Sequence, residues 1–109
     1  MIQVNEEAFA RAIQQTYKGY DEQGALGYAR LWAQRLRPEL QQAVTCWIQG
    51  ERVPNVSYQP EGGKEYSIES IMLLRGKKDV MEAMLLLSDY MNDPRIGEIR
   101  IMTPVRRTR

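Results

Sequence analysis

The sequence contains no histidine and only one cysteine in 109 residues. Without histidine, the chain cannot build a histidine-based catalytic triad, an imidazole general base or a histidine-ligated metal site. Cys46 alone can form neither an intrachain disulfide nor a cysteine-rich zinc site, and such cysteine usage is typical of a reducing, cytoplasmic compartment. These absences predict a protein that is not an enzyme and uses no cofactor.

An excess of one charge and a long hydrophobic run are also absent. Lysine and arginine total 15 against 14 acidic residues, which argues against binding nucleic acid by bulk charge. No segment offers the ~20 unbroken apolar residues that a membrane-spanning helix needs, and the first residues, MIQVNEEAF, lack the parts of a secretory signal. We therefore expect one globular domain over residues 1–104, followed by a disordered basic tail over residues 105–109.

The most apolar stretch, Ser67–Met91, predicts two helices separated at Gly76. Ser67 is a favourable N-cap, Gly76 stands where glycine often ends a helix, and Asp79 can cap the second helix. That second helix is apolar on nearly every face, so we expect it to be buried, with the other elements around it. Its apolar residues are Val80, Met81, Ala83, Met84, Leu85, Leu86, Leu87, Tyr90 and Met91.

Three amphipathic helices are expected in the first half of the chain. The first follows Asn5 as N-cap, the second covers Glu22–Leu36, and the third begins at Pro38. Gly24 and Gly27 leave two interpretations of the second helix open, because glycine in a helix interior costs about 1 kcal/mol relative to alanine. Either these glycines permit the close approach of another backbone, or the helix begins only after Gly27.

The segment Glu51–Tyr66 has no helical periodicity, and it fits either a hairpin turning at Pro60–Gly63 or a long ordered loop. Further along, Ile96–Met102 alternates apolar and polar residues, which predicts a half-buried strand. We therefore predict an α+β, mainly helical fold, in which three amphipathic helices precede a β-α-α-β unit. Its small antiparallel sheet, formed by Val56–Tyr58 and Ile96–Met102, is expected around the central apolar helix.

Two groups of residues with side-chain oxygen atoms are candidates for chemistry. Four carboxylates would suit catalysis only if they converged in the folded chain. A solvent-exposed face and the starts of two helices explain them more simply. These residues are Glu61, Glu65, Glu69 and Asp79. Three residues near the end of the central helix are candidate cation ligands: Asp89, Asn92 and Asp93. Asp93 before Pro94 is, however, typical of a turn. Neither group changes the prediction of a non-enzymatic protein without a metal.

A small protein–protein interaction module is the function that these features favour: an adaptor, an inhibitor or an accessory regulator. Aromatic side chains beside the protruding turn Pro60–Lys64 suit interface anchors, which gives the predicted partner-binding residues Tyr58, Lys64 and Tyr66. Alternatively, both tyrosines simply cover the core. Small size without catalytic equipment is also typical of accessory proteins of phage and other mobile elements. Exposure of Met81 or Met84 would instead indicate a homodimer.

Nucleic-acid binding is the alternative function. The order strand, helix, glycine-containing turn, helix, strand over Val53–Met102 resembles the layout of a winged helix-turn-helix. A recognition helix needs polar side chains for base edges, whereas the second helix of this pair is dominated by leucine and methionine. The expected contacts are therefore limited to phosphates and involve Lys77, Lys78, Arg106 and Arg107.

Overall fold

The computed structural model describes residues 4–76 and 79–103 of the chain. Its internal contacts divide the chain into two compact units, one ending at Pro54 and one beginning at Asn55. The predicted class, α+β and mainly helical with a small antiparallel sheet, is confirmed. A single domain over residues 1–104 stays a prediction, and the basic tail 105–109 lies outside the described residues.

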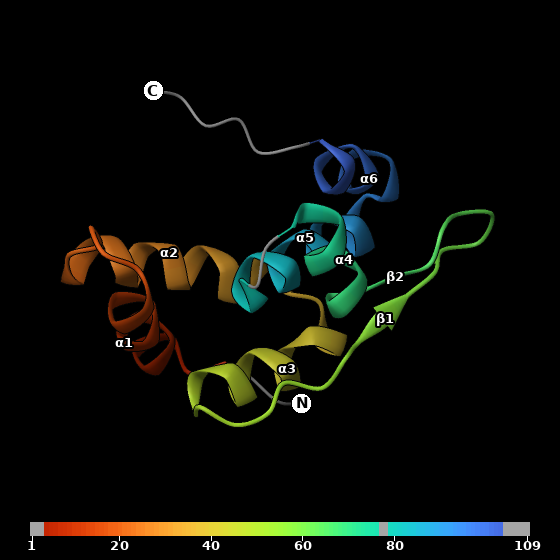
Figure 1. Ribbon diagram of the computed structural model, residues 1–109. Coiled ribbons are helices and arrows are strands. Elements are labelled where there is room, and N and C mark those ends of the chain that lie inside the picture. Colours follow the sequence, from red (N-terminus) through yellow and green to blue (C-terminus); the bar gives the residue numbers. More distant parts are fainter. Residues whose placement is uncertain (1–3, 77–78, 104–109) are drawn as a thin grey trace. The chain divides into compact units, whose positions relative to one another are not determined.

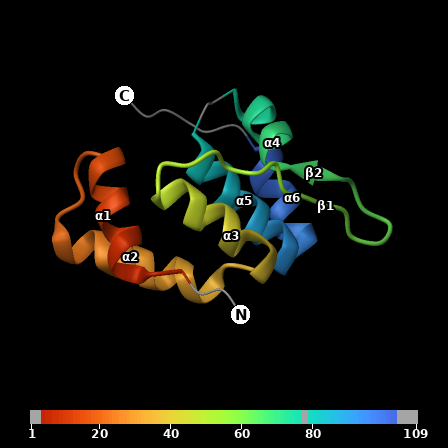
Figure 2. The same ribbon diagram turned by 90° about the horizontal axis from the view of Figure 1, so that it is seen from below.

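The first unit consists of the three predicted helices, α1 (Glu6–Thr16), α2 (Glu22–Arg35) and α3 (Pro38–Ile48). Local signals explain where they begin, because side-chain oxygens of the two N-cap residues, Asn5 and Asp21, accept hydrogen bonds from backbone N–H groups of the first turns. Helices α1 and α2 lie side by side (Figures 1 and 2), and α1 also contacts α3.

The two glycines of α2 fit neither interpretation drawn from the sequence. The helix begins at Glu22, so the interpretation in which it starts after Gly27 is wrong. A Cβ atom at Gly24 would meet only side-chain atoms, the nearest being Asp21 Oδ1 at 2.9 Å, and at Gly27 it would meet no described atom within 4 Å. Close approach of another backbone therefore does not explain these glycines either.

The second unit begins with a short β-hairpin, which confirms the hairpin interpretation of residues 51–66. Strands β1 (Ser57–Tyr58) and β2 (Tyr66–Ser67) pair antiparallel, with Tyr58 opposite Tyr66. The turn between them closes through a hydrogen bond from Gly63 N to the Pro60 carbonyl, and Gly62 takes the left-handed conformation that favours glycine. In both views the turn projects away from the helices of this unit (Figures 1 and 2).

Helices α4 (Ile68–Arg75) and α5 (Val80–Asn92) follow as predicted. Ser67 and Ser70 form a reciprocal capping box, Gly76 ends α4 with a φ of 63°, and Asp79 caps α5. The expected burial of α5 is confirmed, and α4 and α6 pack against it. Its buried residues are Met81, Ala83, Met84, Leu85, Leu86, Leu87, Ser88, Asp89, Tyr90 and Met91.

The last element is a helix, α6 (Pro94–Met102), so the predicted strand Ile96–Met102 is wrong. Asp93 accepts a hydrogen bond from Arg95 N as N-cap, and Pro94 occupies the first turn, where proline loses no hydrogen bond. In this helix Ile101 is buried and Ile99 is exposed, so the alternation of apolar and polar residues does not mark one buried face. Over residues 55–76 and 79–103 the order is therefore β-β-α-α-α and not β-α-α-β, and this part of the chain does not contain the final strand of the winged helix-turn-helix layout.

Two interactions with residues outside α6 fix this helix in place. A Cβ atom at Gly97 would lie 2.2 Å from Tyr90 Cα, so the backbones of α6 and α5 approach too closely for any other residue. At the other end of α6, the Arg75 guanidinium donates hydrogen bonds to the carbonyls of Arg100 and Thr103. These carbonyls belong to the last turn, where intrahelical donors are missing.

Candidate functional site

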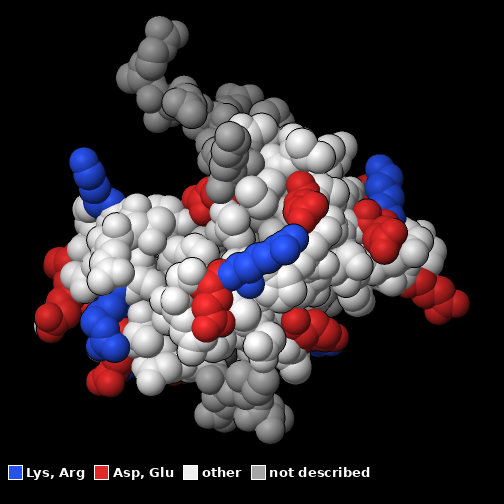
Figure 3. Space-filling model, turned by 60° about the horizontal axis from the view of Figure 1, so that its bottom comes forward, with Lys and Arg blue, Asp and Glu red and all other residues white. Residues whose placement is uncertain are grey.

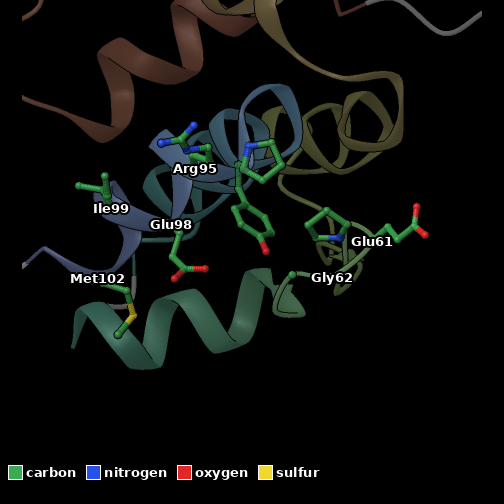
Figure 4. A pocket seen from close by; sticks show the side chains of 10 residues that line it. Glu61, Gly62, Arg95, Glu98, Ile99 and Met102 are labelled. Carbon is green, nitrogen blue, oxygen red and sulfur yellow. The ribbon is translucent and has the colours of Figure 1, made fainter.

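The hairpin turn and α6 form the sides of an open pocket in the second unit, which we call the α6 groove (Figure 4). Its volume is about 560 Å³. It lies on one flank of α6, and the buried Tyr90 of α5 also lines it. The lining residues are Pro60, Glu61, Gly62, Gly63, Tyr90, Pro94, Arg95, Glu98, Ile99 and Met102.

The α6 side of the groove combines apolar and charged side chains. Pro94, Glu98 and Met102 follow one another at intervals of four residues, so they lie along the same flank of the helix. Ile99 is 66% exposed and Met102 is 51% exposed, although both are large apolar residues. The groove therefore carries an apolar rim that the described part of this chain leaves uncovered.

A cluster of three tyrosines anchors the hairpin on α5. The Tyr90 ring is buried and meets the rings of Tyr58 and Tyr66 edge-on, with centroid separations of 5.9 and 4.8 Å. The Tyr90 hydroxyl also donates a hydrogen bond to the Lys64 carbonyl at 2.5 Å. The turn that forms one side of the groove is thus fixed to α5, whose Tyr90 also lines the groove.

Of the sequence-predicted partner-binding residues, Tyr58 and Tyr66 belong to this cluster and Lys64 is hydrogen-bonded to it, and none of the three is among the described residues of the groove lining. Tyr66 is only 4% exposed, Tyr58 is half-buried, and Lys64 is exposed with its Nζ 3.9 Å from Glu98 Oε2. Their role in partner binding stays a prediction, although burial leaves the Tyr66 ring little surface to offer. The sequence prediction did not place the α6 residues in a site, because it assigned them to a strand. The Asp93-Pro94 pair, a helix N-cap followed by proline, was the signal from which a helix could have been predicted.

Burial raises the pKa of the Tyr66 and Tyr90 phenols above the ordinary value of 10.0, and the nearby Glu98 carboxylate raises both further. For Tyr90, the hydrogen bond to the Lys64 carbonyl opposes this shift. Both phenols are therefore neutral at physiological pH. The formal charges of the groove lining come from Glu61, Arg95 and Glu98.

Substitution of phenylalanine for Tyr66 and Tyr90 is expected to have opposite effects on stability. The Tyr66 hydroxyl is buried without a hydrogen-bond partner among the described residues, so Tyr66→Phe should leave the free energy of unfolding unchanged or raise it by about 1 kcal/mol. Tyr90→Phe removes the hydrogen bond to Lys64 and should lower it by about 1 kcal/mol. Urea unfolding of both variants measures the difference, and the same sign of change in both would contradict this geometry.

Three of the acidic candidates are used within the fold. Asp79 caps α5 through Glu82 N, Asp93 caps α6, and the buried Asp89 forms an ion pair with Arg100 at 2.5 Å. Glu61, Glu65 and Glu69 are exposed, the first two on the hairpin and the third in the first turn of α4. Within the described ranges, no group of three acidic or cysteine residues is placed to hold a metal ion.

The residues of the nucleic-acid alternative all lie outside the described residues: Lys77, Lys78, Arg106 and Arg107. On the face shown in Figure 3, acidic and basic side chains are interspersed, and the described residues form no extended basic patch there. Met81 and Met84 are fully buried, so the condition for a methionine-rich self-association surface is not met.

Comparisons of the chain with protein-family models, with curated proteins and with solved structures gave no significant match. Over residues 4–76 and 79–103, no helix combines the length and the apolar character needed to cross a bilayer. The cytoplasmic location stays a prediction.

Proposed function

We propose that this protein is a non-enzymatic interaction module, an adaptor, inhibitor or accessory regulator, which binds another protein through the α6 groove. The observation that carries the proposal is the exposure of Ile99 and Met102 on a helix that borders a concave pocket. Large apolar side chains cost free energy when they face water, and a contiguous group of them is typical of a surface that a partner covers.

The rigidity of the groove supports the same proposal. Gly97 packs directly on the Tyr90 backbone, and Arg75 holds the last turn of α6. On the opposite side, the Tyr90 hydroxyl holds the hairpin at Lys64. A surface that is already ordered loses little conformational entropy when a partner binds, so more of the contact energy appears as affinity.

The composition of the groove favours a protein over a small substrate. A small-molecule site encloses most of its ligand, whereas this groove is open along the exposed side of α6. Its lining offers proline rings, a tyrosine ring and apolar side chains, together with two carboxylates and one guanidinium. Apolar contact area with a few charged groups is the usual make-up of a protein interface.

The double variant Ile99→Asn, Met102→Gln tests the proposal. Both side chains are at least half exposed, so the free energy of unfolding should change by no more than about 0.5 kcal/mol per site. Loss of the apolar contacts should weaken partner binding by about 2 kcal/mol or more. The measurement is affinity capture from lysate of the source cells with wild-type and variant protein, followed by mass spectrometry.

Leu31→Asn provides the matched control, because Leu31 is a half-exposed apolar residue on α2 in the other unit. A protein recovered by the wild type and by this control, but lost with the α6 double variant, supports the proposal. A protein recovered equally by all three excludes the groove as its binding site. Recovery that disappears after nuclease treatment would favour the nucleic-acid alternative.

A further inference from the structure

The charged side chains of the α6 groove are not evenly distributed. Glu98 extends from α6 toward the middle of the pocket, whereas Glu61 extends outward from the turn (Figure 4). Arg95 is on the first turn of α6. The lining thus carries two carboxylates against one guanidinium, and of the two carboxylates that of Glu98 points into the pocket.

The ion pair of Glu98 within the protein is loose. Lys64 Nζ lies 3.9 Å from Glu98 Oε2, at the outer limit of an ion pair, and the two side chains are 64% and 40% exposed. Such an exposed, long pair contributes little to stability, so it can be exchanged for another cation at little cost. Another cationic side chain that took the place of Lys64 beside Glu98 would also lie close to the apolar side chains of the groove.

On the basis of the proposed function, we propose that the groove takes a peptide segment of the partner in which an apolar residue is accompanied by lysine or arginine. The apolar side chain packs between Met102 and the hairpin turn. The basic side chain pairs with Glu98 and displaces Lys64. Within the groove, the basic group pairs with a carboxylate that is partly shielded from water. A charge-assisted hydrogen bond is stronger in such an environment than in open water.

This assignment reverses the role that the sequence suggested for Lys64. As a partner contact, Lys64 would strengthen binding, and its removal would weaken it. As a competitor for Glu98, it opposes binding of a basic segment, so Lys64→Ala should raise the affinity about two- to fivefold. The two roles therefore predict opposite changes in binding affinity for the substitution Lys64→Ala.

Selection of random 12-residue peptides displayed on phage, with the full-length protein as bait, tests the inference. Peptides that depend on Ile99 and Met102 for binding should be enriched in lysine or arginine next to an apolar residue. With Glu98→Lys as bait, the enriched peptides should become acidic. With Glu98→Gln, which avoids repulsion from Lys64, the basic preference should disappear while the apolar preference remains.

Glu69→Lys is the matched control, because Glu69 is an exposed acid on α4 outside the groove lining. It should leave the selected peptides unchanged. Groove-dependent peptides without basic residues, an unchanged preference with both Glu98 variants, or no groove-dependent peptide at all would overturn the inference. A dimer that the α6 double variant dissociates in sedimentation would also overturn it and identify a second copy as the occupant.

The two proposals fail in different experiments. If the α6 double variant retains the partner from lysate, the proposed function is wrong. If that partner is lost but the selected peptides carry no basic residue, the function stands and only the assignment of a basic segment fails.

Discussion

Gly97→Ala is expected to lower the free energy of unfolding by about 3 kcal/mol, the upper part of the usual range for overpacking. The added Cβ would lie 2.2 Å from Tyr90 Cα and 2.6 Å from Tyr90 N, and backbone atoms cannot move aside as a flexible side chain can. Alanine gains about 1 kcal/mol of helix propensity over glycine, but the clash outweighs this gain. Urea unfolding measures the net effect.

Gly27→Ala is the control for this prediction. Gly27 also lies inside a helix, but an added Cβ there meets no described atom within 4 Å. The propensity term should act alone and raise the free energy of unfolding by about 1 kcal/mol. Stabilisation by both substitutions would contradict the close packing of α6 on α5.

Leu87→Ala is expected to cost about 2–5 kcal/mol, the range for truncating a buried leucine. Leu87 is fully inaccessible to solvent, and Leu85 and Leu86 are also buried, so the three consecutive residues face protein in different directions around α5. Leu73→Ala should change stability by no more than about 0.5 kcal/mol, because Leu73 is 83% exposed. Nearly neutral alanine variants at Leu85, Leu86 and Leu87 would show that α5 is not the buried central helix.

Most helix boundaries could be predicted from the sequence because they depend on neighbouring residues. Asn5, Ser67 and Asp79 each accept a hydrogen bond from a backbone N–H three residues along the chain. Gly76 ends α4 through its own left-handed conformation. Such signals lie within one helical turn, so they can be recognised without knowledge of the tertiary structure.

The sequence contains a local start signal for helix α6, the Asp93-Pro94 pair, but the alternating pattern that follows is typical of a strand, and long-range interactions hold the helix in position. Ile99 and Ile101 alternate with polar residues as in a strand, yet Ile101 is buried and Ile99 is exposed on opposite sides of a helix. The close contact of Gly97 with Tyr90 and the capping of α6 by Arg75 involve residues seven and more than 20 positions away. No short sequence window contains these interactions.

In the candidate site too, some residues are indicated by the local sequence, whereas others are brought together only in the folded chain. Composition drew attention to the turn Pro60–Lys64, and Pro60–Gly63 form one side of the groove, while a role of the turn in partner binding stays a prediction. The opposite side depends on α6 and was therefore missed. The edge-on packing of Tyr58 and Tyr66 on Tyr90 also joins residues that only the folded chain brings together.

Amide chemical-shift mapping of the captured partner's binding site tests the central claim most directly. Adding the unlabelled partner to ¹⁵N-labelled protein should shift the amide signals of the turn, at Gly62 and Gly63, and of α6, at Glu98, Ile99 and Met102. The signals of α1 and α2 should stay in place. Shifts confined to α1 and α2, with the turn and α6 unaffected, would contradict the assignment of the α6 groove as the interaction site.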